Sequence, residues 1–454
     1  MFYSVAGKNM ENNINNKIHP RLLIVGTVPY NKKMQSRAFD AYFHQWEPEN
    51  IVQVFSNPMT PQKGHCSELF QITDAMMLHR WFNHNFEVGR YFKRQELSEL
   101  SSTEDSRKNN SLVSKLYKAG KRKGALNHLL RKLLWRKKFW CTNSFLEWCD
   151  RFNPECVFLA FSDDFFIPEI ALFFAKRYDV PIVSCIGDDY YFNNQPSFSP
   201  FYHLYRRQYK KLIDKVFAHG GSAIYISDKI RDKYNKEFGL DGQTVYLTSE
   251  IKRRQFRPIS TEQPVVSYFG NISLGRNNSL NDIGHALYEI NHNYKLCIYS
   301  NETSSHLVGV FKDNPGIIFK GAVPYAQVME ETNKSDILVI VEGFALENIT
   351  AVKYSLSTKA ADSLASGASI FTYGPLESGV IDYMKSTGAS VVCTDANNLK
   401  VDLSSLINDV QLQRQLYEKA IAISKEHHSI ESSNVISENV VINSIQRYNK
   451  HVER

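Results

Sequence analysis

Short apolar runs alternate with longer amphipathic stretches along most of the chain. In the first half these runs occupy residues 21–30, 50–58, 154–165, 180–192, 215–220 and 244–249. Each has the length of one β-strand, and the runs are largely apolar throughout, which indicates strands that are buried on both faces of a sheet. The stretches between them have helical patterns. This alternation predicts an α/β fold with a largely parallel sheet.

The pattern stops once and then restarts. Residues 250–264 are rich in charge and proline, and we interpret them as an interdomain linker. Six further apolar runs follow, at residues 264–273, 294–300, 316–321, 337–344, 368–375 and 390–395. Two successive series of βα units predict two Rossmann-like, doubly wound lobes that face a common cleft. The expected division is 1–255 for the first lobe, 262–405 for the second, and 406–454 for helices that can cross back to brace the first lobe.

Parallel sheets bind ligands beyond the carboxyl ends of their strands, so residues at those ends are the candidates for chemistry. The most informative segment is LSTKAADSLASGASIFTYGP, residues 356–375. Ser357 and Thr358 are suited to cap a helix whose free N–H groups attract an anion, and Lys359 adds a full positive charge beside them. Asp362, one turn further, is placed to accept a hydrogen bond from a ribose hydroxyl. The alternative is an ordinary capped helix between two strands.

With its neighbours, this segment resembles the donor-binding region of GT-B glycosyltransferases. The bacterial family-four type, which builds capsule, exopolysaccharide or lipopolysaccharide, is the most similar in pattern. YFGNISLGRNNSL, residues 268–280, resembles the turn that opens the second lobe and meets the donor pyrophosphate. VEGFALEN, residues 341–348, is similar to the family's Glu-Gly-Phe turn near the donor sugar. The resemblance implies a donor-binding set of Gly270, Asn271, Arg276, Glu342, Ser357, Thr358, Lys359 and Asp362.

One position departs from the family's pattern. The family often carries a second glutamate after seven intervening residues, whereas the corresponding position after Glu342 is Thr350. We expect Asp362 to supply the second acidic function, after a longer loop.

Two acidic doublets follow consecutive strands of the first lobe, Asp163–Asp164 and Asp188–Asp189. Paired carboxylates can hold a divalent cation or act as a general base toward an acceptor hydroxyl. The resemblance implies that Arg, Lys and a helix end, rather than a metal, neutralise the leaving diphosphate. We therefore expect Asp163 and Asp188 to bind the acceptor, and we take Asp188, Asp189 and Glu342 as the catalytic candidates. Helix capping is an equal alternative for Asp163 and Asp164.

The loop after the first strand, GTVPYNKKMQSRAF, resembles the first loop of this fold, which passes close to the cleft. Gly26 allows close backbone approach there. Arg37 is a candidate for contact with the acceptor or with the donor phosphate, and the start of a surface helix is its alternative role. The loop has no GxGxxG pattern, so it is not a dinucleotide-binding fingerprint.

Positive charge is concentrated in one segment. The formal charge of the chain is +7, and no acidic residue occurs between Asp105 and Glu147. Within that interval, residues 115–138 combine lysines and arginines with leucines at helical spacing. Such a basic amphipathic helix suits an anionic membrane surface; the alternative is a solvated helix whose apolar side packs on its own lobe. Nucleic-acid binding is not expected, because no recognised motif accompanies the charge.

Targeting and metal signals are missing from the sequence. The first twenty residues hold no apolar run of signal-peptide length, and no later segment reaches the roughly 18 apolar residues of a spanning helix. We therefore expect a cytoplasmic protein that is either free or peripheral on the inner membrane face. The seven cysteines are scattered without a CxxC pair, which predicts free thiols. We expect no metal, and no cofactor apart from a nucleotide-sugar substrate.

The sequence thus favours a glycosyltransferase of surface polysaccharide biosynthesis. It would move a sugar from a nucleotide-sugar donor to a carbohydrate or lipid-linked oligosaccharide acceptor. Arg276, Lys359 and the helix that begins at Ser357 would stabilise charge on the leaving diphosphate, and closure of the lobes would exclude water. The resemblance implies retention of anomeric configuration. Two alternatives are a cytoplasmic non-catalytic sugar- or nucleotide-binding protein and a GT-B-shaped sugar-nucleotide epimerase.

Overall fold

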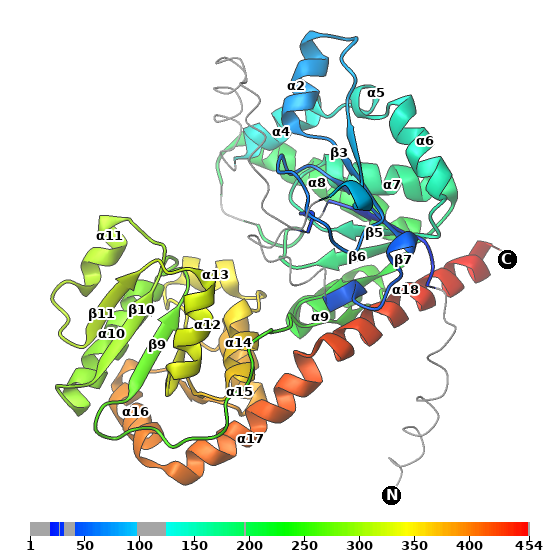
Figure 1. The fold of residues 1–454 in the computed structure, drawn as a ribbon. Helices are drawn as coiled ribbons and strands as arrows, with labels where there is room; N and C mark the ends of the chain where they lie inside the picture. Colours follow the sequence, from blue (N-terminus) through cyan, green and yellow to red (C-terminus); the bar gives the residue numbers. More distant parts are fainter. Residues whose placement is uncertain (1–18, 27, 31–40, 98–123, 195–196, 453–454) are drawn as a thin grey trace, which may run out of the picture.

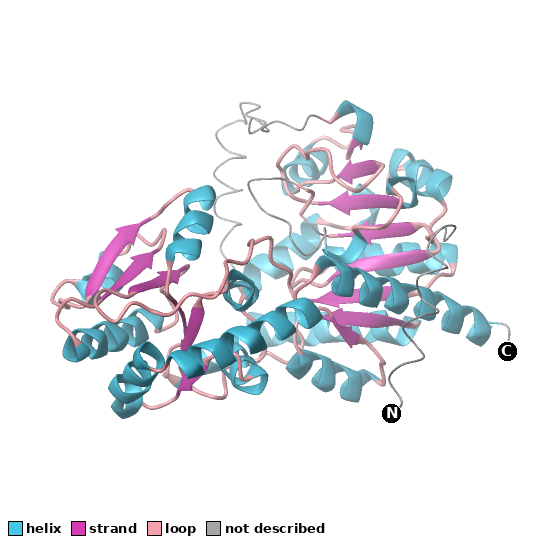
Figure 2. Cartoon of the chain, turned by 60° about the horizontal axis from the view of Figure 1, so that its bottom comes forward, coloured by secondary structure: helices cyan, strands magenta, loops and turns pink. Residues whose placement is uncertain are grey.

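The computed structural model describes residues 19–26, 28–30, 41–97, 124–194 and 197–452. These residues form two α/β lobes that lie side by side (Figure 1), and each lobe is built around its own twisted sheet (Figure 2). The α/β class and the two largely parallel sheets predicted from the sequence are confirmed.

The first lobe contains an eight-stranded sheet. Its strands are β1 (Leu22–Val25), β2 (Ile51–Phe55), β3 (Glu68–Gln71), β4 (Arg90–Lys93), β5 (Cys156–Ala160), β6 (Ile182–Ile186), β7 (Gly221–Tyr225) and β8 (Gln243–Thr244). They lie in the order β4-β3-β2-β1-β5-β6-β7-β8, and only β4 runs antiparallel to its neighbour. Strand order reverses between β1 and β5. In doubly wound sheets, ligands bind beyond the carboxyl edge at such a reversal.

The helices of the first lobe cover both faces of this sheet. They are α2 (Asp74–Phe82), α4 (Ala125–Leu134), α5 (Lys137–Trp140), α6 (Asn143–Phe152), α7 (Phe166–Tyr178), α8 (Pro200–His219) and α9 (Asp228–Phe238), with short 3₁₀ turns at Pro48–Asn50 and Arg94–Glu96. Their aromatic side chains fill the main core, where Trp135 and Phe166 stack with ring centroids 3.7 Å apart.

Two predicted strands of the first lobe are wrong in whole or in part. Of the run 244–249 only Thr244 lies in a strand, β8, and the run 215–220 is not a strand. Residues 215–220 almost all belong to the end of α8, and the strand β7 begins only at Gly221. The buried side chains Tyr205, Tyr209, Ile213 and Val216 are spaced by three or four residues, so the apolar stripe of α8 continues through this run.

The second lobe contains a six-stranded parallel sheet. Its strands are β9 (Val265–Phe269), β10 (Lys295–Tyr299), β11 (Ile317–Gly321), β12 (Ile337–Val341), β13 (Ser369–Tyr373) and β14 (Val391–Cys393). They lie in the order β11-β10-β9-β12-β13-β14. This is the doubly wound order, in which the direction of winding reverses between β9 and β12. Each strand lies within one of the six apolar runs of the second series, as predicted.

The helices of the second lobe alternate with these strands. They are α10 (Arg276–Ile290), α11 (Ser305–Val308), α12 (Tyr325–Lys334), α13 (Leu346–Val352), α14 (Thr358–Ser366), α15 (Gly379–Thr387) and α16 (Leu399–Asn408), with 3₁₀ turns at Gly309–Phe311 and Ala396–Asn398. The helix α14 starts and ends where the sequence predicted, with Ser357 as its N-cap and Gly367 in the left-handed region after its last turn.

Two segments connect the lobes. Residues 245–264, which contain neither helix nor strand, lead from the first lobe to the second. The chain returns through α17 (Val410–His427), on the second lobe, and α18 (Ile430–Val452), which packs against β7 and β6 of the first lobe (Figure 1). Val440 and Val441 of α18 are buried in the same cluster as Ile24 and Ile224 of the first sheet. The described residues contain no helix that is long and apolar enough to cross a membrane. All seven cysteines are free thiols.

Candidate functional site

Two glycine-containing loops meet where the winding of the second sheet reverses. One follows β9 and the other follows β12. A Cβ atom on Gly343 would lie 2.3 Å from the carbonyl oxygen of Leu274, and one on Gly275 would lie 2.4 Å from Nδ2 of Asn348. Gly275 also has a φ of 75°, which other residues rarely adopt. The glycines therefore let the two loops touch backbone to backbone, and this brings the first turn of α10 against the end of β12.

That contact creates a bidentate ion pair. Arg276, the first residue of α10, donates from Nε to Oε2 of Glu342 (2.8 Å) and from Nη2 to Oε1 (3.0 Å). Glu342 is almost fully buried and Arg276 is largely buried. Ser279 fixes the glutamate from behind, because its hydroxyl donates to the Glu342 carbonyl oxygen (2.8 Å). Two oriented bonds in a sheltered position make this a rigid group whose guanidinium charge is largely compensated.

Lys359 reaches the same place from the first turn of α14. Its side chain passes over Gly270, where an added Cβ would lie 2.4 Å from the Lys359 Cε atom, and its ammonium lies 5.1 Å from the centre of the Tyr268 ring. Burial, and then the charge of the nearby Arg276, lower the pKa of Lys359 to about 8. Among the described residues no carboxylate forms an ion pair with this ammonium. The site therefore holds a sheltered positive charge that an anion is suited to neutralise.

The start of α14 adds to this positive potential. The Ser357 side chain accepts a hydrogen bond from the Lys359 backbone N–H, and Thr358 is the first residue of the helix. Asp362, one turn on, accepts from the hydroxyl of Ser249 (2.7 Å), which ties α14 to the interlobe linker. A cavity of about 40 Å³ opens beside them, lined in part by Phe269, Tyr325, Met329, Lys359 and Asp362.

The structure thus places the predicted donor-binding residues of the second lobe around one point. Gly270, Arg276, Glu342 and Lys359 surround the reversal between β9 and β12, and Ser357, Thr358 and Asp362 lie on or beside the helix that carries Lys359. Asn271 lies in the same loop, where its side chain is exposed and its Oδ1 accepts from the Ser273 N–H (2.6 Å). Their roles toward a ligand stay predictions.

The two aspartates after β6 have different surroundings. Asp188 is exposed, and its Oδ1 accepts from the hydroxyl of Ser355 on the second lobe (3.3 Å). Asp189 is directed into its own lobe, where it accepts from the Phe192 N–H (2.8 Å) and the Tyr234 hydroxyl (3.0 Å) and pairs with Lys233 (3.4 Å). Asp188 therefore lies at the boundary between the lobes, in contact with Ser355, which is two residues before the Ser357 cap of α14. Asp189 stabilises its own turn.

The aspartates after β5 belong to an ion-pair cluster with α4. Asp164 pairs with Arg131, and His128 lies 3.4 Å from Asp164 and 3.7 Å from Asp163. Burial raises the pKa of Asp164, but His128 and Arg131 outweigh this effect, and the net shift is downward. His128, Asp163 and Asp164 offer possible metal-ligand atoms within 4.8 Å of one another, although one Asp164 oxygen already binds the guanidinium of Arg131.

His128 and Arg131 of α4 could not be predicted as partners of these aspartates, because they are more than thirty residues away in the sequence and have no characteristic spacing. Arg37, an acceptor-binding candidate, lies outside the described residues, as do residues 115–123 of the basic segment.

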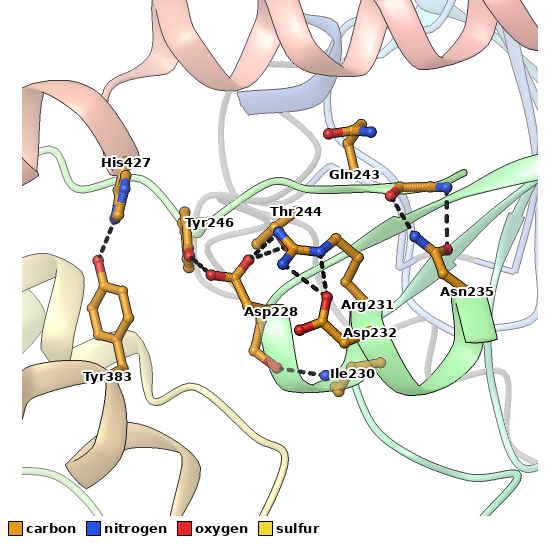
Figure 3. Close-up of polar contacts among 12 residues, drawn as sticks. Asp228, Ile230, Arg231, Asp232, Asn235, Gln243, Thr244, Tyr246, Tyr383 and His427 are labelled. Atoms are coloured by element: carbon orange, nitrogen blue, oxygen red, sulfur yellow. Dashed lines mark hydrogen bonds and ion pairs between the residues drawn. The ribbon is translucent and has the colours of Figure 1, made fainter. Parts of the chain in front are cut away.

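Polar contacts join the lobes near this site. Ser227 donates to the Tyr354 carbonyl oxygen (2.6 Å), and Lys229 of the first lobe pairs with Asp382 of the second (3.1 Å). In the linker, the Tyr246 hydroxyl donates to Asp228 (2.8 Å), as Figure 3 shows. These contacts hold the start of α9 against the second lobe and the linker, and the Asp188–Ser355 bond places Asp188 beside the segment that leads into α14.

Comparisons with known proteins identify the fold. No protein-family model and no curated protein matches this chain in sequence. Among solved structures, Anabaena HepE in complex with UDP superposes with a TM-score of 0.54 at 9% identity, over 95% of this chain and 99% of that chain. A trehalose-6-phosphate structure from E. coli, bound with UDP-2-fluoro glucose, gives a TM-score of 0.54 at 9% identity, over 94% and 99% of the chains. The apo structure of OtsA gives 0.55 at 9% identity, over 93% and 98%.

A more limited match is S. aureus TarM, with a TM-score of 0.45 at 13% identity over 65% of this chain; the chain spans 58% of the length of that protein. The HepE and OtsA matches extend over both lobes and the connection between them, and these neighbours are GT-B glycosyltransferases. The chain therefore has the GT-B fold.

Proposed function

We propose that this chain is a glycosyltransferase that moves a sugar from a nucleotide-sugar donor onto a carbohydrate or glycolipid acceptor. The observation that carries the proposal is the Lys359 ammonium, which has no carboxylate partner among the described residues and lies beside the Arg276–Glu342 pair where the second sheet reverses its winding. Doubly wound sheets bind ligands at this point, and a sheltered cation there suits a diphosphate.

In the proposed reaction the bond between the anomeric carbon and the diphosphate oxygen breaks, and the diphosphate leaves with the electron pair. The acceptor hydroxyl oxygen forms the new bond to that carbon and gives up its proton. Lys359, Arg276 and the amino end of α14 stabilise the charge that grows on the leaving oxygens, because they are fixed in place before the reaction. We assign acceptor binding and proton removal to Asp188, which is exposed at the lobe boundary, and donor-sugar positioning to Glu342.

The proposal also covers the donor nucleotide, the stereochemistry of transfer, the metal requirement and the biological role. The neighbours HepE and OtsA make a UDP-sugar the first donor to test, because UDP is the ligand named for HepE and UDP-2-fluoro glucose the one named for the E. coli structure. We propose transfer with retention and without a metal ion, as in the family-four type that the motifs resemble, and a role in surface polysaccharide biosynthesis.

The test is release of free UDP or GDP from UDP- and GDP-sugars, and of CMP from CMP-sugars, with and without added oligosaccharide or lipid-extract acceptors. A transferase releases the nucleotide only when the acceptor is present, and it does so in the presence of EDTA if no metal is needed. An epimerase would change the sugar without an acceptor, and a non-catalytic binder would release no nucleotide from a donor that it binds. Either of these results would contradict the proposal.

A further inference from the structure

The outer face of α4 is apolar. Leu126, Leu130 and Leu133 are 47%, 53% and 49% exposed. They follow one another at intervals of four and three residues, so they form one stripe along the helix. The polar side chains of α4 make the contacts that hold it in place: Arg131 pairs with Asp164, and the Lys132 ammonium donates to Gln208 of α8 (2.9 Å). The leucines therefore face outward on a helix whose position is fixed.

Two neighbouring helices, α2 and α8, pack against α4. α2 lies against α4 where Trp135 donates to Asp74 (2.7 Å), and α8 lies against α4 where the Tyr205 ring stacks on His128. Both helices expose large apolar side chains of their own. We call the exposed apolar side chains of these three packed helices the α4 face; they are Trp81, Phe82, Leu126, Leu130, Leu133, Phe201 and Leu204.

Positive charge borders the α4 face. Arg136, Lys137 and Lys138 follow α4 directly and are exposed. Each lies over an aromatic ring, and Arg136 lies over Trp81 of the face itself. In the described part of the chain no carboxylate forms an ion pair with these three side chains, and residues 124–146 contain no acid. Leucines that enter the acyl region, with cations at headgroup level, are the pattern of an interfacial helix on an anionic bilayer.

The α4 face also lies close to the proposed acceptor side. His128 and Arg131 contact Asp163 and Asp164, which follow β5, so α4 lies at the carboxyl edge of the first sheet. Asp188 follows β6, the next strand of the same sheet. A surface that bound the α4 face would therefore lie beside the part of the cleft where we place the acceptor.

We propose that the α4 face docks on an anionic membrane and that the acceptor is a glycolipid presented from that membrane. The acceptor assignment rests on the proposed function, whereas membrane docking does not require any catalytic activity. The occupant is lipid rather than nucleic acid, because solvent-exposed leucines lie among the cations. It is lipid rather than a second copy of the chain, because the bordering charges are all positive and would repel the same charges on the other copy.

Docking is tested by sedimentation of the full chain with vesicles made of equal parts of phosphatidylcholine and phosphatidylglycerol. We expect binding that weakens on vesicles of phosphatidylcholine alone and at high salt. Affinity for the anionic vesicles should fall roughly tenfold or more in the triple variant Leu126→Gln, Leu130→Gln, Leu133→Gln. The same loss is expected in the triple variant Arg136→Gln, Lys137→Gln, Lys138→Gln. The single variant Leu130→Gln, which should fold even if the triple variant does not, should show a smaller loss.

Matched controls lie on the other lobe. Val401→Gln with Val410→Gln removes exposed apolar side chains, and Lys312→Gln, Lys385→Gln, Lys425→Gln removes three exposed charges; both should bind like wild type. Unchanged vesicle binding by both α4-face triples would overturn the proposal. So would a wild-type chain that binds no vesicles, or a leucine variant whose only effect is to turn a dimer into a monomer. Nucleotide release on a soluble acceptor tests the proposed function separately, since it needs no membrane.

Discussion

Lys359 is the residue on which the proposed diphosphate site depends most. Its ammonium is sheltered beside Arg276, whose own charge is already balanced by Glu342, so the excess positive charge at this point is that of Lys359. Sheltering a charge without a partner destabilises the empty protein, and a bound diphosphate would remove that cost. The side chain follows its path only because residue 270 is a glycine.

The replacement Lys359→Met should therefore stabilise the empty protein. Burial holds the pKa of Lys359 at about 8, below its ordinary 10.5, so between these values the unfolded chain binds more protons than the folded one. Wild-type stability should then rise as pH increases from 8 to 10.5, and the full penalty is present at pH 7. We expect the free energy of unfolding of Lys359→Met to be about 1 kcal/mol or more above that of wild type at pH 7. This difference should shrink toward pH 10.

Urea unfolding at the two pH values measures this difference. The exposed Lys312 is the matched control, and Lys312→Met should change stability by less than about 0.5 kcal/mol. A Lys359→Met variant that is less stable than wild type at pH 7 would be inconsistent with a sheltered, unpaired charge.

At the scale of elements, a hydrogen-bonded chain joins α15, the linker and the junction of α17 with α18. His428 Nδ1 lies 2.6 Å from the Leu247 carbonyl oxygen, which can only accept, so this nitrogen carries the proton. The other ring nitrogen, Nε2, then accepts from the Tyr383 hydroxyl (2.8 Å), and the Tyr383 oxygen accepts from His427 Nδ1 (2.9 Å; Figure 3 shows the latter pair). The arrangement requires a neutral His428.

Acid should therefore weaken the fold through this junction. Burial lowers the pKa of His428 to about 4 from 6.5, so below pH 6.5 the unfolded chain takes up a proton that the folded chain refuses. Stability falls as pH drops from 6.5 toward 4 and is retained above 6.5. The variant His428→Asn keeps a donor for the Leu247 carbonyl oxygen but does not titrate. Its free energy of unfolding should therefore fall less than that of wild type over this pH range, by roughly 2 to 3 kcal/mol.

Chemical unfolding at pH 6.5 and pH 4.5 gives the comparison, with the exposed His306→Asn as control. If the free energy of unfolding fell by the same amount between pH 6.5 and pH 4.5 in wild type and in His428→Asn, His428 would be excluded as the titrating group.

Helices and strands were predicted correctly where the local sequence pattern alone determines the structure. The apolar runs of the second lobe became strands, and α14 begins at its predicted cap, because its start signal and its apolar face agree. β3 was not predicted, since Glu68–Gln71 has only two apolar residues and is held by its neighbours. The run 215–220 was assigned to a strand because its composition is apolar, whereas the longer stripe that includes Tyr209 and Ile213 makes it helical.

For the whole molecule, the sequence predicted two lobes but not their contacts. Asp188 meets Ser355 across 167 positions of the chain, and Asp189 is engaged by Lys233 and Tyr234. The two aspartates are adjacent residues of the same type, so the sequence does not tell which of them lies at the lobe boundary. The packing of the two lobes shows that Asp188 lies there and that Asp189 stabilises its turn. The grouping of the residues proposed to bind the donor was easier to predict, because the motif places them at strand ends that topology alone brings together.

The central claim is that Arg276 and Lys359 hold a nucleotide diphosphate at the reversal of the second sheet. It is tested most directly by titration calorimetry of UDP, GDP and CDP into wild type, Arg276→Gln, Lys359→Met and the control Lys312→Met. We predict one-site binding of at least one of the nucleotides to wild type and to Lys312→Met. A loss of affinity of roughly tenfold or more is expected in each of the two site variants, since bonds to charged groups contribute about 1.5 to 3 kcal/mol. Wild-type affinity in both site variants would contradict the account.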